Sequence, residues 1–379
     1  MISESIRAIL KTNLGVRKDE RLLVFTDTMR KTEVVGSQDF CRRERLGDIA
    51  LLIAEIGKAF AKKVVYTDFP ATTVHGAEPP EELWRLAFGN KTMDRLHTAR
   101  ILGPLLLKTA SDEEIRKAEE IVKRYCRSSV HAVVALSNYS TSHTKFRDFL
   151  TRVCGCRYAS MPLFDVAMLG ASMNVDWKAL ARRTVAVTRI VNKADTIEIR
   201  TPNGTRLTLS KRGRKALSDT GILTRKGSFG NLPAGETFLA PREGTAQGEL
   251  VLEWAPTREL RSPVALVVRD GLVTEIKGKE PFSEVLGAKL KESAENRNIA
   301  ELGIGTNERA QRPDNILESE KILGTVHVAL GDNSSFGGMV KTPFHQDFVF
   351  FRPTIILTDR NGKRSTLMKD GKFKEIPLR

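Results

Sequence analysis

Cysteine is scarce in this chain of 379 residues: there are four, and Cys154 and Cys156 are near neighbours. This arrangement provides neither a disulfide framework of the secreted type nor a paired Cys-x-x-Cys zinc site. Nowhere do apolar residues run uninterrupted for the roughly eighteen positions that a membrane-spanning helix needs. We therefore expect a cytoplasmic protein with no membrane partner.

Several signatures of common enzyme classes are also missing. The sequence contains no P-loop, no Gly-x-Gly-x-x-Gly fingerprint and no Gly-x-Ser-x-Gly elbow. The net charge of +15 invites a nucleic-acid partner, because basic side chains neutralise phosphates. However, only Lys211–Lys215 forms a basic cluster, and no aromatic residues are interleaved there. The charge is better explained by a solvated surface, and nucleic acid is not an expected partner.

The length predicts two domains, which we place at residues 1–185 and 186–379. In the first, short apolar runs at 21–27, 63–68 and 131–137 alternate with helical patterns. Ser111 and the acids after it mark the start of one helix. This alternation predicts an open, mostly parallel α/β domain.

The pattern changes after about residue 185. Residues 196–210, 264–276 and 354–369 alternate polar and apolar side chains around Asn-Gly or Asp-Gly turns, as β-hairpins do. A single helical pattern, at about 282–296, interrupts these strands. The fold class is therefore α/β, with the parallel domain followed by a β-rich (α+β) domain.

Five polar residues interrupt apolar runs of the second domain: Glu236, Glu301, His327, His345 and Asp347. Burying carboxylates and imidazoles among apolar side chains is costly unless they are paired or bind a metal. These ligand types suit zinc, cobalt, manganese or iron, and five ligands exceed what one catalytic ion normally takes. We therefore expect two divalent metal ions (zinc, cobalt or manganese), and we expect residues 186–379 to form the catalytic domain.

Each of these residues also has an ordinary structural explanation. Glu236 would then cap a turn, Glu301 would pair with Arg297 or Arg309, and His327 would be a core histidine. In the first domain, His143 precedes a predicted helix, where it would either bind a ligand or belong to a cap formed by Ser142 or Thr144.

Four segments of the second domain resemble, in order, the ligand segments of the aminopeptidase T and aminopeptidase S metallopeptidase family. They are Asn-Leu-Pro-x-Gly-Glu from residue 231, Glu-Leu-Gly-Ile-Gly-Thr-Asn from residue 301, Gly-Thr-Val-His-Val-Ala-Leu-Gly from residue 324, and His-x-Asp at 345–347. The resemblance implies a cytoplasmic homodimer that removes N-terminal residues from small peptide substrates.

The same resemblance implies roles for individual residues. Glu236, Glu301, His327, His345 and Asp347 would bind two metals, with Glu301 as the bridge. Two neighbouring ions would activate a shared water. Glu301 or Glu236 would be the catalytic carboxylate that accepts its proton.

The sequence departs from that family at two places. Ser334 stands where its members typically carry a tyrosine, and the loop of residues 331–344 is shorter. A related family, the 2,5-dihydroxypyridine 5,6-dioxygenases, holds one ferrous ion with a set that His327, His345 and Asp347 would equally supply. Because Glu236 and Glu301 stand where the peptidases have further ligands, we expect the hydrolase, with the dioxygenase as the alternative. A metal-bound protein without catalytic activity is the third possibility.

Overall fold

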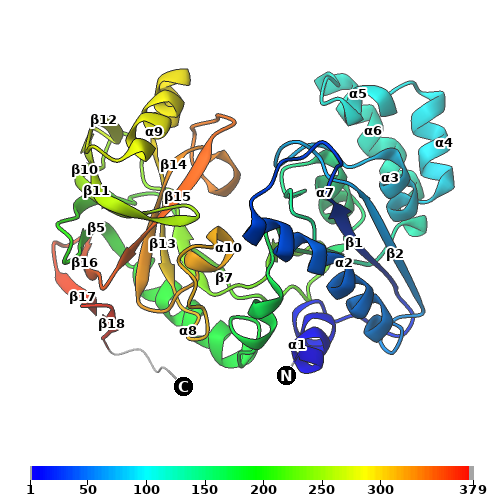
Figure 1. Ribbon diagram of the computed structural model, residues 1–379, viewed down its shortest axis with the longest axis horizontal. Coiled ribbons are helices and arrows are strands. Elements are labelled where there is room, and N and C mark those ends of the chain that lie inside the picture. Colours follow the sequence, from blue (N-terminus) through cyan, green and yellow to red (C-terminus); the bar gives the residue numbers. More distant parts are fainter. Residues whose placement is uncertain (1, 375–379) are drawn as a thin grey trace. The chain divides into compact units, whose positions relative to one another are not determined.

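The computed structural model describes residues 2–374 (Figure 1). The chain forms two compact units, one of Met1–Asn174 with Gly221–Pro233 and one of Val175–Thr220 with Ala234–Arg379. The boundary expected at residue 185 falls inside helix α8 (Trp177–Val191) of the second unit. None of the helices within residues 2–374 is long and apolar enough to cross a lipid bilayer.

The first unit is built on a five-stranded sheet in the order β2-β1-β3-β4-β8. All four pairings in this sheet are parallel. The parallel α/β layer predicted for this part of the chain is therefore confirmed. The strands are β1 (Arg21–Thr28), β2 (Lys63–Pro70), β3 (Ala132–Ala135), β4 (Arg157–Ser160) and β8 (Phe229–Asn231).

Helices cover both faces of this sheet. Gly57 brings helix α2 against Leu22 of β1, while Phe25 packs on the opposite side with Trp84 and Phe146. The helices and helical turns are α1 (Ile2–Ala8), η1 (Ile9–Asn13), α2 (Ser37–Gly57), α3 (Glu81–Phe88), α4 (Asn90–Thr98), α5 (Leu102–Leu106), α6 (Asp112–Tyr125), η2 (Cys126–Ser128), α7 (Lys145–Asp148), η3 (Phe149–Val153) and η4 (Val166–Gly170).

Two helix starts match sequence signals. Ser111 and Glu114 form a reciprocal capping box at α6, which confirms the start predicted there. Helix α7 begins at Lys145, and the Thr144 hydroxyl accepts a hydrogen bond from the Arg147 N–H. The cap formed by Thr144 is therefore confirmed, and ligand binding by His143 stays a prediction.

The second unit contains two antiparallel sheets. The larger has the order β12-β11-β10-β6-β5-β16-β17-β18 and contains the three predicted hairpins. Its strands are β5 (Ala194–Arg200), β6 (Arg206–Ser210), β10 (Gln247–Ala255), β11 (Arg258–Arg269), β12 (Leu272–Lys277), β16 (Thr354–Asp359), β17 (Arg364–Lys369) and β18 (Lys372–Phe373).

The smaller sheet has the order β15-β14-β13-β9-β7. Its strands are β7 (Leu217–Asp219), β9 (Glu236–Leu239), β13 (Ile299–Gly305), β14 (Thr325–Gly331) and β15 (His345–Phe351). Besides α8, the helical segments of this unit are α9 (Pro281–Glu292), η5 (Ala294–Arg297), α10 (Ile316–Ser319) and η6 (Ser334–Phe336). Helix α9 corresponds to the helix predicted between the hairpins.

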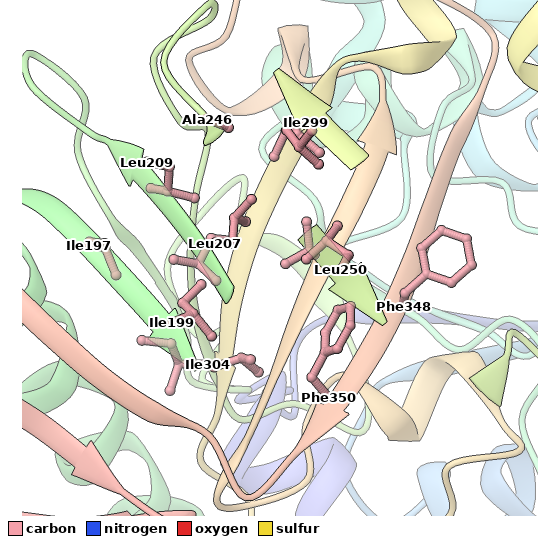
Figure 2. Packing of buried hydrophobic residues seen from close by; sticks show 14 of the residues in the cluster. Ile197, Ile199, Leu207, Leu209, Ala246, Leu250, Ile299, Ile304, Phe348 and Phe350 are labelled. Atoms are coloured by element: carbon pink, nitrogen blue, oxygen red, sulfur yellow. The ribbon is translucent and has the colours of Figure 1, made fainter. Parts of the chain in front are cut away.

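The core of the second unit contains side chains from both sheets. Figure 2 shows Ile199 and Leu207 of the larger sheet near Ile304 and Phe350 of the smaller one. Successive side chains of a strand point to opposite faces. In the smaller sheet, the core positions alternate with positions that face the other way, and this second face carries the polar residues.

Candidate metal centre

The five predicted ligands lie on one face of the smaller sheet. They come from the adjacent strands β9, β13, β14 and β15. On each strand they alternate with residues of the apolar core, which are Leu239, Leu302, Ile304, Val326, Val328, Phe348 and Phe350. With a side-chain period of two, the polar residues therefore point away from that core and toward one another.

Small residues on this face make room for the polar side chains. Gly305 pairs with Glu236, and Gly303 pairs with His327. Ala329 of β14 lies opposite both Glu301 and Asp347 in its two strand pairings. A side chain at Gly303 would collide with the ring of His327, and one at Gly305 would collide with the backbone of Ile322.

The side-chain atoms lie at ligand spacing. His327 Nε2 is 3.2 Å from Glu236 Oε2 and 3.5 Å from Glu301 Oε1. His345 Nε2 is 3.5 Å from Glu301 Oε2 and 3.4 Å from Asp347 Oδ2. Two overlapping groups of potential ligands result, Glu236 with Glu301 and His327, and Glu301 with His345 and Asp347. Glu301 belongs to both.

These spacings fit a divalent cation. Two ligands of one ion, each about 2.0–2.2 Å from it, lie roughly 3.0–3.5 Å apart. Buried Glu236 Oε2, which faces His327 Nε2, also has no hydrogen-bond partner within the described part of the chain. The residues present therefore suit a divalent metal, and the coarser expectation of a metal-binding cluster agrees with the structure.

Burial and charge shift the pKa values of these groups in opposite directions. Burial favours the neutral imidazole of His327, but a hydrogen bond with Glu301 and the charges of Glu236 and Asp347 outweigh it and raise the pKa to about 9. Burial likewise opposes the charged form of His345, yet the Asp347 carboxylate dominates and raises the pKa of His345 to about 10.

The carboxyl groups of the cluster differ from each other. Burial raises the pKa of Glu301, and the hydrogen bond to His327 only partly offsets this effect. Burial acts in the same sense on Asp347, but the charge of His345 prevails and lowers its pKa below the usual range. Protons on the two imidazoles thus balance the carboxylates, and a metal ion would replace these protons.

The structural explanations considered for single residues do not account for this arrangement. The side chain of Arg297 donates to the Leu290 carbonyl, whereas the carboxylate of Glu301 contacts His327 and His345. His327 is indeed buried in a strand, but it faces two carboxylates.

A charged pair that the sequence did not single out completes the cluster. The ammonium of Lys321 is buried and lies 2.5 Å from Glu236 Oε1 and 2.8 Å from Glu320 Oε2. Burial favours the neutral amine, but the two carboxylates outweigh it and raise the pKa of Lys321 well above its usual range. In the sequence, Glu320 and Lys321 look like an ordinary exposed pair before a turn, so no local signal distinguishes them.

The short loop after β14 fixes the orientation of His345. Its Nδ1 atom lies 2.8 Å from the carbonyl oxygen of Asp332, so that Nε2 faces Glu301 and Asp347. Ser334 is exposed, and its hydroxyl donates to the carboxylate of Asp332. The serine therefore contributes to the shape of the loop and contacts no predicted ligand in the described hydrogen bonds.

The comparisons with known proteins identify the family. A family model described as NicX, 2,5-dihydroxypyridine 5,6-dioxygenase, matches residues 163–374, which is more than half of the chain. The chain belongs to this family. The 2,5-dihydroxypyridine 5,6-dioxygenase of Pseudomonas putida is 26% identical over 195 residues, which cover 47% of this chain and 55% of that protein. The chain thus aligns with about half the length of the curated relative.

Solved structures support the fold. The 2,5-dihydroxypyridine dioxygenase of Pseudomonas putida KT2440 superposes with a TM-score of 0.69 at 18% identity, covering 100% of this chain and 98% of that one. Wild-type AmpT from Thermus thermophilus has a TM-score of 0.56 at 15% identity, with 98% of each chain covered. The predicted likeness to aminopeptidase T therefore holds for the fold.

The predicted activity is corrected by the same comparisons. Both the family model and the curated relative are named as dioxygenases. The prediction of an aminopeptidase, a hydrolase acting on peptides, is therefore wrong, and the alternative weighed against it is supported. The error has a physical cause: the NicX family and the peptidases share a fold, and the same polar face suits either one ion or two.

Proposed function

We infer that this protein is an iron(II)-dependent dioxygenase that opens the ring of a hydroxylated aromatic compound of the dihydroxypyridine type. Membership of the NicX family carries this proposal. The ligand chemistry supports it, because two histidines and one carboxylate with open positions are typical of non-haem iron oxygenases. His327, His345 and Asp347 are the residues that would hold the ion.

Iron(II) held by these three residues would activate dioxygen for the reaction. The protein's own contribution begins with Glu301, which lies between the two imidazoles. Glu301 contacts both proposed imidazole ligands but is not needed as a ligand of the three-residue set. Its carboxylate would accept a proton from a substrate hydroxyl.

Aromatic side chains provide a surface for a planar ring. Phe336 packs edge-to-face on Phe238, with ring centroids 5.8 Å apart, and on His345 at 6.1 Å. Phe238 lies on the same strand as Glu236 and on the same face of the sheet. Such rings favour an aromatic substrate through edge and face contacts, and they exclude water from one side of the centre.

Isotope incorporation tests this proposal directly. The metal-free protein is loaded with iron(II) without oxygen and then given 2,5-dihydroxypyridine and ¹⁸O₂. We expect oxygen uptake, loss of the ring absorbance and a product with both labelled atoms. His345→Ala and Asp347→Ala should abolish turnover, whereas His97→Gln, a change of an exposed histidine on α4, should not. Oxygen uptake that leaves the ring intact, or label that enters only from water, would contradict the proposal.

The assembly is a separate proposal. The homodimer expected from the sequence stays a prediction, and the mass of the protein in solution tests it.

A further inference from the structure

The ammonium group of Lys321 is placed beside the candidate metal centre without a part in the proposed reaction. Its side chain is 1% exposed, and the described ion pairs join it to Glu236 and Glu320. Glu236 uses Oε1 for this ion pair and directs Oε2 toward His327. The same carboxylate therefore links the lysine to one of the two groups of potential ligands.

The backbone holds Lys321 in this position. The Lys321 N–H donates to the Glu318 carbonyl, and the Lys321 carbonyl accepts from the Asn307 N–H. Ile322, the residue after Lys321, approaches β13 closely at Gly305. A β-carbon at Gly305 would lie 2.0 Å from the carbonyl oxygen of Ile322. These contacts place the ammonium between its two carboxylates.

We propose that Lys321 is an internal cation that takes the place of a second metal ion and limits the centre to one divalent ion. This inference rests on the proposed iron-dependent function. With His327 assigned to the iron, a second ion would depend on Glu236 and Glu301 of the first group, but Glu236 already compensates the charge of Lys321. An ion on Oε2 would also lie within a few ångströms of the ammonium and be repelled by it.

Loss of the lysine would change the charge of this cluster. The ammonium of Lys321 lies between the carboxylates of Glu236 and Glu320. Replacement of the lysine by a neutral side chain leaves a buried carboxylate pair without its cation. Such a pair is unfavourable until another cation arrives. A second divalent ion at Glu236 is the cation that the remaining ligands can hold.

Metal stoichiometry tests the inference. Wild type, Lys321→Met and the control Lys289→Met, which alters an exposed lysine of α9, are saturated with manganese(II), desalted and analysed for metal per chain. We expect one ion in the wild type and in Lys289→Met, and two in Lys321→Met. The two ions should also give the electron paramagnetic resonance spectrum of a coupled manganese pair. If Lys321→Met is too unstable to purify, Lys321→Gln, which keeps an N–H donor for the carboxylates, has the same expected result.

The outcomes separate this inference from the proposed function. One ion in the wild type and one in folded Lys321→Met or Lys321→Gln would overturn the role of the lysine and leave the mononuclear centre intact. Two ions in the wild type would overturn the mononuclear centre itself. Two ions in each Lys321 variant, with one ion in the wild type, would support both the role of the lysine and the mononuclear centre.

Discussion

The imidazole of His327 occupies the space beside Gly303 on the neighbouring strand, and a β-carbon at Gly303 would be 1.9 Å from His327 Cε1. No side chain other than hydrogen fits at that position while the ring keeps its place. The glycine therefore does more than permit a turn, because it sets the position of a proposed ligand in the middle of a buried sheet.

Gly303→Ala should therefore weaken metal binding. The methyl group displaces the ring of His327 from the carboxylates, and we expect the affinity for manganese(II) to fall by at least about tenfold. Titration against a chromophoric chelator measures this change, and circular dichroism reports whether the sheet persists. The matched control is Gly287→Ala in α9, where the new methyl group meets only Ile276 at an ordinary 3.7 Å. Equal losses in both variants would refute the specific role of Gly303.

The loop that carries Asp332 depends on Asn333, whose side chain is fully buried. Asn333 donates to Glu243 Oε1 and accepts from the Val340 N–H. Asn333→Ala leaves the Val340 N–H without its acceptor and removes one of two donors to Glu243 Oε1, which also accepts from the Met339 N–H. We therefore expect about 1–3 kcal/mol less unfolding free energy. Because the loop orients His345, manganese affinity should fall as well.

Ser334→Ala is the control for that loop variant. The exposed Ser334 hydroxyl bonds only to Asp332 among the described contacts, so its loss should change the unfolding free energy by about 0.5 kcal/mol or less. Urea unfolding with and without manganese measures both quantities. An Asn333→Ala protein with the stability and affinity of Ser334→Ala would show that the loop does not depend on this side chain.

Local patterns were sufficient for the main features of the fold. The parallel strands and the hairpins follow from apolar periodicity and turn residues, and the structure confirms them. The placement of the five polar residues on one face also has a local cause. Each alternates with core residues along its own strand, so that burial of one face directs all of them to the other.

Other features depend on contacts between distant segments. Strand β8 contains only three residues, and it joins the first sheet because it lies beside β4. The turn that carries Lys321 packs against β13 because Gly305 has no side chain there. The activity was missed for a related reason, since identical ligand types serve hydrolysis and oxygenation, and the number of bound ions depends on groups such as this lysine.

Glu78 gives the first unit a predicted pH dependence. Its buried carboxylate accepts hydrogen bonds from the N–H groups of Lys145 and Phe146 at the start of α7. Burial raises its pKa to about 7. For an acid with a raised pKa, the folded state binds more protons than the unfolded state between about pH 4.5 and 7. The stabilisation from this group is therefore largest at low pH and declines as pH rises through that range.

Glu78→Gln should remove this pH dependence. Between pH 5 and 7, the wild type should lose up to about 3 kcal/mol relative to the variant in the opening free energy of this region. Hydrogen exchange of the Phe146 amide measures that local opening. Glu82→Gln, an exposed change on α3, should follow the wild type. Parallel pH profiles of wild type and Glu78→Gln would show that Glu78 does not titrate in this range.

Metal affinity should rise steeply with pH. The metal-free protein carries protons on His327 and His345, whose pKa values are raised to about 9 and 10, and a metal ion binds only the deprotonated nitrogens. Below pH 9, binding must therefore release both protons. The association constant for manganese(II) should increase by up to about 100-fold per pH unit between pH 6 and 8, more slowly above pH 9, and level off above about pH 10.

Calorimetry in two buffers of different ionisation enthalpy counts these protons at each pH. We expect close to two released per ion in the wild type and about one fewer in His345→Ala, because that variant lacks one of the protonated rings. His97→Gln should release the same number as the wild type, since His97 lies on a helix of the first unit and pairs with Glu81. A pH-independent affinity, with no proton release at pH 7, would mean that the imidazoles are already neutral in the metal-free protein. The carboxylates around them would then hold no imidazolium, and the charge balance described for this cluster would be wrong.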